Sequence, residues 1–290
     1  MNNGEINKIV VCGAGTMGRG IAQVAAQHGF PTVLYDLQEP IIQQARAAID
    51  DSLNVLVDKG KLSEENKKKV YRLLEFTREI EHCNGDLIIE AIVEIPKVKT
   101  ELFNQLAGIN PPKTIFATNT SSLSVSQIAE GIANPERVVG MHFFNPAPVM
   151  KLVEVVKGIY TSDQTIRAIF SVAKRLQKTA VLCKDAPGFI VNHVARPYYI
   201  ESLRLIEAGI TDFSTIDSLL ESTGFKMGPF KLMDLIGNDV NFAVSCSVYQ
   251  QLGEPSRLKP SWIQEEKVKH GELGRKTGKG YYNYNSPGLR

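Results

Sequence analysis

The chain has 290 residues, 43% of them hydrophobic, which is enough to bury the core of one large domain or of two ordinary ones; we expect two. Its 33 basic and 31 acidic residues are mixed along the chain and leave a formal charge of +2, which excludes the extended basic surface typical of nucleic-acid-binding proteins. The first apolar run is too short and too rich in glycine for a secretory signal or a membrane span, so we expect a cytoplasmic protein without membrane contact.

Four cysteines are scattered along the chain without any CxxC pair: Cys12, Cys83, Cys183 and Cys246. Neither a zinc site nor a disulfide framework is indicated by this spacing. We therefore expect reduced, mostly buried thiols and no bound metal.

Short β-branched runs alternate with helical patterns through the first two thirds of the chain. The predicted strands are KIVVC (8–12), TVLYD (32–36), DLIIEAI (86–92), TIFATN (114–119), RVVGMHFF (137–144), KLVEVV (151–156) and AVLC (180–183). This rhythm predicts a Rossmann-type, doubly wound α/β fold with a mainly parallel sheet. The long polar stretch from about Glu39 to Arg78 predicts a helical excursion on the surface.

The pattern changes after Asp185. Pro187 precedes an apolar-periodic run and Gly209 follows it, and these are helix start and stop signals. The segments 213–222, 228–252 and 261–270 also have helical patterns. We therefore predict an α/β domain of residues 1–186 and an all-helical C-terminal domain of residues 187–290.

A glycine-rich loop, GAGTMG, joins the first predicted strand to an amphipathic helical pattern. One glycine allows a tight turn, one lets a pyrophosphate approach the backbone, and one lets the helix pack closely on the strand. These glycines are Gly13, Gly15 and Gly18. The N-terminus of the helix would face the phosphates with unpaired N–H groups, so the loop predicts a dinucleotide site.

The second predicted strand ends in Asp36, at the distance where an acid accepts hydrogen bonds from the adenosine ribose. The same carboxylate repels a 2′-phosphate, so the sequence favours NAD over NADP. Arg19 and Arg46 are not far away in the sequence and leave some tolerance of NADP open. The alternative is a strand-to-helix turn with incidental glycines and an incidental acid.

Two polar residues interrupt apolar strands near the middle of the chain. His142 lies in VVGMHFF and Glu154 in LVEVV, and a turn at NPAP (145–148) would bring imidazole and carboxylate together. Glu154 would orient the ring and stabilise its cation, while the other ring nitrogen takes the proton of a substrate hydroxyl. Two alternatives are a core histidine that a carbonyl group satisfies, and His193 as the base.

Several segments, in order, resemble the successive signatures of the L-3-hydroxyacyl-CoA dehydrogenase family. They are GAGTMG, EAIVE (90–94), NTSSL (119–123), GMHFFNPAPVMKLVEVV (140–156), PGFIVN (187–192), MGPFKLMDLIGND (227–239) and GRKTGKGYYNY (274–284). The likeness covers essentially the whole chain. It implies reversible, NAD-dependent oxidation of (S)-3-hydroxyacyl-CoA to 3-oxoacyl-CoA in fatty acid metabolism, with a short acyl chain such as 3-hydroxybutyryl. It also implies an NAD-binding first domain and a helical second domain for substrate binding and homodimer formation.

The resemblance also implies roles for individual residues. His142 matches the family's base and Glu154 its carboxylate partner, while Ser121 and Asn192 match groups that position the reacting oxygen and the thioester. Residues that match contacts to the cofactor are Glu94, Lys99, Asn145 and Lys276, and those that match contacts to coenzyme A are Ser52 and Lys59.

Two of these assignments have ordinary structural alternatives. Lys59 fits a solvated surface lysine equally well, although a mobile cation on an exposed helix can also meet CoA phosphates. Ser121 and Ser122 follow a predicted strand, where open α/β sheets bind ligands, but serines there also cap helices. Ser124, just before VSQIAEG, is the stronger candidate for the cap.

The acyl chain is the least determined feature. His193 and the ARPYY that follows resemble dehydrogenases acting on 3-hydroxyadipyl-CoA in phenylacetate degradation, and Arg196 would recognise the free carboxylate if it faced the substrate. A sugar-acid or hydroxyacid dehydrogenase and a non-catalytic NAD-binding protein are the remaining hypotheses.

Overall fold

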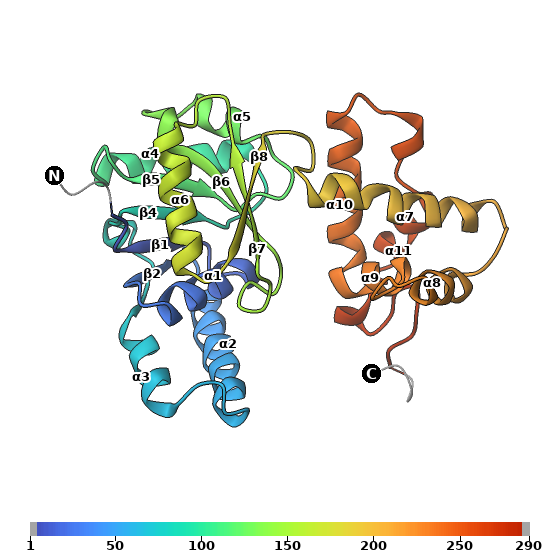
Figure 1. Ribbon diagram of the computed structural model, residues 1–290, viewed down its shortest axis with the longest axis horizontal. Coiled ribbons are helices and arrows are strands. Elements are labelled where there is room, and N and C mark those ends of the chain that lie inside the picture. Colours follow the sequence, from blue (N-terminus) through green and yellow to red (C-terminus); the bar gives the residue numbers. More distant parts are fainter. Residues whose placement is uncertain (1–4, 286–290) are drawn as a thin grey trace. The chain divides into compact units, whose positions relative to one another are not determined.

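The structure, a computed structural model, describes residues 5–285. The chain forms two compact units that meet in the sequence between Ala186 and Pro187 (Figure 1). The first unit is an α/β layer structure and the second is helical. Within the described residues, no helix combines the length and apolar character needed to cross a membrane.

One eight-stranded sheet forms the centre of the α/β unit, in the order β3-β2-β1-β4-β5-β6-β7-β8. Its strands are β1 (Ile9–Cys12), β2 (Thr32–Tyr35), β3 (Leu74–Thr77), β4 (Leu87–Glu90), β5 (Ile115–Thr118), β6 (Val138–Phe143), β7 (Leu152–Lys157) and β8 (Thr179–Lys184). Neighbouring strands are parallel except β6 and β7, which pair antiparallel. The predicted Rossmann-type fold class is therefore confirmed, since the order from β3 to β6 is that of a doubly wound sheet.

β3 was not predicted from the sequence. The stretch expected to be a helical excursion contains helices α2 (Glu39–Asp58) and α3 (Glu64–Arg72), but it ends in an edge strand beside β2. The segment LEFT has only four residues, of which only Thr77 is buried. A half-exposed edge strand carries little apolar alternation, so pairing with β2 rather than local pattern determines this structure.

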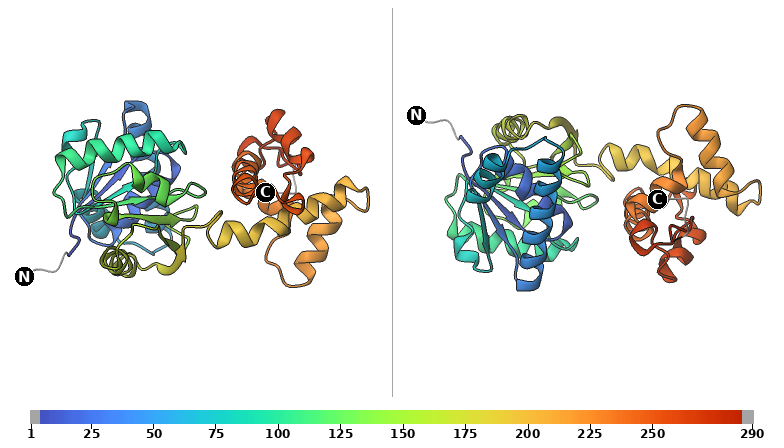
Figure 2. Two further views of the ribbon diagram at one scale, coloured as in Figure 1. Left: turned by 90° about the horizontal axis from the view of Figure 1, so that it is seen from above. Right: turned by 90° about the horizontal axis from the view of Figure 1, so that it is seen from below.

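Helices cover both faces of the sheet. The remaining helices of the unit are α1 (Thr16–Gln27), α4 (Pro96–Ile109), α5 (Val125–Glu130) and α6 (Asp163–Arg175). Residues of α1, α2 and α6 share one apolar core on one face, whereas α4 packs Phe103 against Phe116 on the other, with ring centroids 5.3 Å apart. Figure 2 shows α4 and α6 on opposite sides of the sheet.

Strand alternation sends the polar residues of the central strands to the face that α4 and α5 cover. Met141 and Phe143 belong to the core under α1, α2 and α6, so His142 between them points the other way. Both β7 neighbours of Glu154 are in the same core, and the alternation along β4 likewise directs Glu90 to the α4 face. Three ionisable side chains thus leave one face of the sheet.

The helical unit contains α7 (Val191–Glu207), α8 (Phe213–Ser222), α9 (Pro229–Ile236), α10 (Asn238–Gln251) and α11 (Trp262–Lys269). All four segments with helical patterns form helices, with two differences from prediction. α7 begins at Val191 rather than directly after Pro187, and the segment 228–252 is divided at Gly237. Gly237 has φ +103°, a backbone conformation that a continuous helix does not contain.

A buried aspartate joins three parts of the helical unit. Asp217 in α8 accepts hydrogen bonds from the backbone N–H groups of Phe230 (2.9 Å) and Lys231 (3.0 Å) and from Tyr282 Oη (2.7 Å). Burial raises the pKa of this carboxyl, and the hydrogen bonds oppose that effect. The carboxylate holds the start of α9 and the C-terminal segment against α8.

Asp234 in α9 binds the same C-terminal segment. It accepts hydrogen bonds from the backbone N–H groups of Tyr281 and Tyr282, from Tyr284 Oη and from Asn238 Nδ2, each at 3.0 Å. Tyr281 also packs into the apolar core of the unit. The final segment is therefore part of the folded unit rather than an appendage to it.

We expect Asp234→Ala to lower the free energy of unfolding by about 3 kcal/mol, because four donors to a buried carboxylate lose their acceptor. Chemical denaturation followed by circular dichroism measures the change. Asn283→Ala is the matched control, because Asn283 lies in the same segment but is exposed. Equal stabilities of the two variants would contradict this account of the segment.

Candidate active site

The glycine loop is packed tightly on its protein side. Gly13 has φ +99°, and a Cβ atom there would lie 2.5 Å from the Ala91 carbonyl oxygen. A Cβ atom at Gly18 would lie 1.7 Å from the Gly13 carbonyl oxygen, so α1 and β1 approach more closely than any other residue permits. These two glycines are required by the fold itself.

Gly15 is open on its other side. Among residues 5–285, apart from Gly15 itself, its chain neighbours and the adjoining helix backbone, no atom lies within 4 Å of a Cβ atom built there, and no side chain caps the helix that Gly15 begins. The N-terminus of a helix without a cap presents N–H donors and the positive end of its dipole. The loop therefore fits the pyrophosphate of a dinucleotide.

Asp36 follows β2 beside this loop and is half-buried. One carboxylate oxygen accepts a hydrogen bond from Ala14 N at 2.8 Å and the other from Gln38 N at 3.0 Å. A carboxylate has about four acceptor positions, so two ribose hydroxyls can still bind. Arg46 stacks over the Phe76 ring, 4.4 Å from its centroid. The charged group bound to the loop backbone is the Asp36 carboxylate, which would repel a 2′-phosphate. This arrangement fits NAD.

His142 and Glu154 are directly opposite each other in the antiparallel pair of β6 and β7. The distance from Nδ1 to Oε2 is 2.7 Å, and the residues are only 5% and 1% exposed. The turn at 145–148 therefore brings together the two polar residues that interrupt these strands. An ionised Glu154 can only accept a hydrogen bond, so the proton of this contact then lies on Nδ1.

The geometry of this pair suits proton transfer. When Nδ1–H donates to Glu154, the Nε2 atom of a neutral ring is an acceptor. A proton taken by Nε2 makes the ring an imidazolium cation. The Glu154 carboxylate beside it stabilises this cation, and their attraction is strong because the site is buried. On β8, burial and then the charges of Glu154 and Asp185 raise the pKa of the Cys183 thiol to about 12, so this neighbour stays protonated.

The loop after β5 lies beside the pair. Asn119 Oδ1 accepts a hydrogen bond from Phe143 N at 2.8 Å, which joins the loop to the residue after His142. Ser121 N donates to Glu94 Oε1 at 3.1 Å. Because β5 and β6 are parallel, this loop and His142 share the carboxyl edge of the sheet, where doubly wound folds bind ligands.

The helix cap predicted for this loop is confirmed. Ser124 is the N-cap of α5, and its Oγ accepts a hydrogen bond from Gln127 N at 3.2 Å. Ser121 lies three residues earlier, so capping of α5 does not account for it. Its place between Glu94 and the carboxyl edge leaves the role in substrate binding as the hypothesis to test.

Lys99 is more deeply buried than its assignment to the cofactor suggests. It is 1% exposed, and its Nζ lies 2.5 Å from Glu90 Oε1 and 3.1 Å from Glu94 Oε2. Its ammonium group therefore serves two carboxylates. Of the two carboxylates, Glu90 is the buried one, and its role was not predicted from the sequence. An acid at the end of the apolar strand LIIE was the available signal.

Three further candidates lie in the α/β unit. Asn145 is exposed in the turn between β6 and β7. Ser52 on α2 accepts a hydrogen bond from Gln23 Nε2 of α1 at 3.0 Å, and Lys59 is exposed at the C-terminus of α2. Ser52 is thus turned toward α1, whereas Lys59 extends into solvent.

Two candidate site residues lie in the helical unit, as does Arg196, the possible contact to a free substrate carboxylate. Asn192 is in the first turn of α7, and Lys276 pairs with Asp239 at 2.6 Å. Arg196 is only 2% exposed and donates to the Asn192 and Asn241 carbonyl groups. Burial lowers its pKa to about 10. The side chain is enclosed between α7 and α10, so the condition on which Arg196 would recognise a substrate carboxylate, an open side chain, is not met in its own unit.

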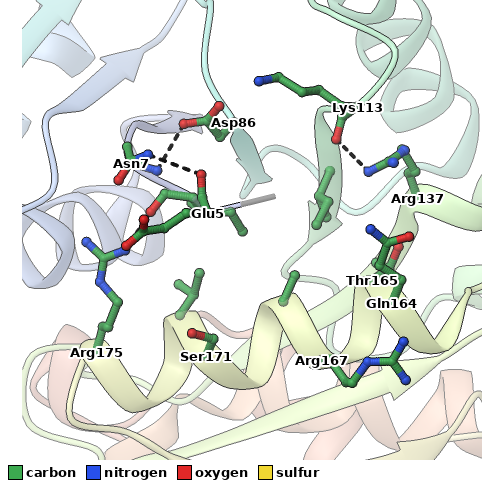
Figure 3. Close-up of a pocket in the computed structure, with 14 residues that line it drawn as sticks. Glu5, Asn7, Asp86, Lys113, Arg137, Gln164, Thr165, Arg167, Ser171 and Arg175 are labelled. Carbon is green, nitrogen blue, oxygen red and sulfur yellow. Dashed lines mark hydrogen bonds between the residues drawn. The ribbon is translucent and has the colours of Figure 1, made fainter. Parts of the chain in front are cut away.

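A cavity of about 960 Å³ lies at the opposite, amino edge of the sheet (Figure 3). Asp86, Lys113 and Arg137 precede strands there, and Arg167 and Arg175 come from α6. Figure 3 shows these cationic groups standing apart around the rim, with Arg137 turned to the Lys113 carbonyl. None of the candidate site residues lines this cavity.

Comparison with known proteins identifies two matching domains. Residues 8–186 match the 3-hydroxyacyl-CoA dehydrogenase NAD binding domain, and residues 188–284 match the C-terminal domain of the same family. The chain is 46% identical to the 3-hydroxyadipyl-CoA dehydrogenase of Escherichia coli, over 97% of this chain and 59% of that protein. It is 39% identical to a probable 3-hydroxybutyryl-CoA dehydrogenase of Deinococcus radiodurans, over 96% of this chain and 100% of that protein.

Solved structures of similar fold include two 3-hydroxybutyryl-CoA dehydrogenases. A 3-hydroxybutyryl-CoA dehydrogenase from E. coli superposes with a TM-score of 0.93 at 45% identity, covering 97% of this chain and 60% of that one. An (S)-3-hydroxybutyryl-CoA dehydrogenase from Ralstonia eutropha has a TM-score of 0.92 at 35% identity, with coverage of 97% and 100%.

Two alanine substitutions in the glycine loop separate folding from binding. Gly18→Ala should cost about 3 kcal/mol of stability, because the methyl group meets a backbone oxygen. Gly15→Ala should change stability by less than about 1 kcal/mol but weaken NADH binding about tenfold, because the methyl group occupies the space for the pyrophosphate. Thermal unfolding and titration calorimetry measure both. Unchanged NADH affinity in Gly15→Ala would refute this location of the cofactor.

Proposed function

This chain belongs to the 3-hydroxyacyl-CoA dehydrogenase family, and we propose that it oxidises (S)-3-hydroxyacyl-CoA to 3-oxoacyl-CoA, reversibly and with NAD. The observation that carries this proposal is the buried pair of His142 and Glu154, 2.7 Å apart on the same sheet whose β1 leads into the dinucleotide loop. The substrate we propose has a short acyl chain, such as 3-hydroxybutyryl-CoA.

In the proposed mechanism, His142 is the general base. Its Nε2 accepts the proton of the C3 hydroxyl as the C–O bond becomes a carbonyl. Bound NAD supplies the acceptor for the hydride that leaves C3. Glu154 holds the ring in the required tautomer and stabilises the imidazolium through the 2.7 Å contact to Nδ1. In the reverse direction the imidazolium returns its proton to the oxygen.

Positioning of the substrate is also part of the proposal. Ser121 and Asn192 would hold the reacting oxygen and the thioester, and the contact from Ser121 N to Glu94 supports the first of these roles. The remaining assignments follow the family: Gly13, Gly15, Gly18, Asp36, Glu94, Lys99, Asn145 and Lys276 for NAD, and Ser52 and Lys59 for coenzyme A. Lys99 would act through Glu94, since its amine is enclosed.

A second candidate substrate is 3-hydroxyadipyl-CoA, which is favoured by the 46% identity to the E. coli protein of that name. The proposed reader of its free carboxylate, Arg196, is buried against carbonyl groups of its own unit. The adipyl substrate would therefore need another cation. Assembly as a homodimer through the helical unit also belongs to the proposal, supported by large exposed apolar side chains there, such as Leu219, Phe225 and Trp262.

The activity is tested by mixing the purified protein with NAD and a panel of substrates and following NADH absorbance. The panel contains 3-hydroxybutyryl-CoA, 3-hydroxyadipyl-CoA, sugar acids and a blank. We expect turnover of thioesters that falls by at least about 100-fold in His142→Ala, because general-base catalysis is lost. Preference for free hydroxy or sugar acids, or no turnover at all, would contradict the proposal. The ratio of kcat/KM for the two thioesters decides the acyl chain.

Glu154→Gln tests the pairing itself. We expect kcat to fall by about 100-fold or more while the KM for NAD stays within about twofold, because the carboxylate acts when the imidazole becomes charged. Glu101→Gln is the matched control, since Glu101 is an exposed residue of α4. An unchanged kcat in Glu154→Gln would show that the pair has no part in catalysis.

A further inference from the structure

We propose that Glu90 is a positioning residue of the active site, which fixes Glu94 through Lys99 and thereby sets the backbone of Ser121. The inference rests on the proposed function, because Ser121 is taken there to bind the reacting oxygen. Glu90 itself is completely buried and cannot contact a substrate. Its effect must therefore pass through its neighbours.

The first step is the immobility of Glu90. Its Oε1 accepts hydrogen bonds from Lys99 Nζ at 2.5 Å and from Ile92 N at 2.8 Å, and its Oε2 accepts from Thr118 Oγ1 at 2.7 Å. Both carboxylate oxygens are thus occupied by donors from β5, from α4 and from the segment after β4. A buried carboxylate with three such donors has one orientation.

The second step is the bridge made by Lys99. The Lys99 side chain is 1% exposed, and its ammonium group contacts two carboxylates. Glu90 is buried, whereas 37% of the Glu94 side chain is exposed. A buried cation must be compensated, so the position of Lys99 follows from the positions of these two carboxylates. The 3.1 Å contact to Glu94 Oε2 therefore transmits the position of Glu90 to the edge of the site.

The two carboxylate oxygens of Glu94 have different partners. Oε2 meets Lys99, whereas Oε1 accepts hydrogen bonds from Ser121 N at 3.1 Å and from Thr120 Oγ1. The orientation of the carboxylate, set from one side by the cation, thus fixes the peptide of Ser121 on the other. A rotation of the Glu94 carboxylate would therefore displace Oε1 and weaken its hydrogen bond with Ser121 N.

Glu90 also holds the same loop through its backbone. Its carbonyl oxygen accepts a hydrogen bond from Asn119 N at 2.8 Å, and Asn119 Oδ1 accepts one from Phe143 N. The start of the loop is therefore fixed between Glu90 and the residue after His142. Substitution of the Glu90 side chain leaves this backbone link intact and changes only the branch that runs through Lys99 and Glu94.

Glu90→Gln removes the negative charge of this side chain and leaves its size almost unchanged. The amide fills the same volume and can keep its contacts with Ile92 N and Thr118 Oγ1, but Lys99 then has a single anionic partner. We expect Lys99 to move toward Glu94 and to turn its carboxylate away from Ser121 N. The kcat should fall about tenfold, since small displacements of positioning groups have effects of this size.

The test is a double-mutant cycle with Ser121→Ala, measured as kcat on 3-hydroxybutyryl-CoA. If Glu90 acts through Ser121, the tenfold loss should shrink to less than about twofold in the Ser121→Ala background. A second cycle with Glu94→Gln should give the same loss of additivity and serves where Ser121→Ala is too slow to assay. Independent, multiplicative losses in both cycles would overturn the inference.

Asn110→Ala is the matched control for a purely structural effect. Asn110 is buried in the same unit at the amino edge of the sheet, where its side chain binds Gly85 N at 2.9 Å and the Cys83 carbonyl at 2.8 Å. It should lower the melting temperature and leave kcat unchanged. An equal loss of kcat in Asn110→Ala would reduce Glu90 to a general stabiliser. A wild type inactive on thioesters would instead refute the proposed function.

Discussion

A carboxylate stays ionised inside a protein only where cations or hydrogen-bond donors surround it, and this constraint organises both units of the chain. Glu90 and Glu154 are buried in the α/β unit, and Asp217 and Asp234 in the helical unit. Each receives donors from another element or from the segment that follows its own. The buried acids therefore connect elements that apolar packing alone would leave free to shift, and Glu90 and Glu154 do so at the candidate site of the α/β unit.

The antiparallel pairing of β6 and β7 positions the two residues proposed for proton transfer. Parallel neighbours need a long crossover, so residues that face each other there are far apart in sequence. A short turn instead sets His142 opposite Glu154, twelve residues later, on the dry face that α4 and α5 cover. The dinucleotide loop belongs to the parallel part, at the carboxyl end of β1. One sheet thus offers a cofactor edge and a proton-transfer pair from two kinds of strand pairing.

The features that could be predicted from the sequence are local. The glycine loop and the pairing of His142 with Glu154 follow from spacing, because a short turn at 145–148 joins two strands in which each polar residue lies among apolar neighbours on the opposite face. β3 was missed because an edge strand has little pattern of its own. The role of Glu90 and the inward direction of Arg196 depend on which faces of distant elements meet. That information lies in tertiary packing, which spacing along one chain does not encode.

The attachment of the C-terminal segment to α8 and α9 has a consequence for synthesis on the ribosome. Residues 281–284 supply donors to both Asp217 and Asp234, so the helical unit cannot complete its interior until these residues have left the exit tunnel. The α/β unit ends at Ala186 and has no such dependence. The two halves of the chain should therefore acquire structure in order, and a nascent chain stopped before Tyr281 would expose an unfinished unit to proteolysis.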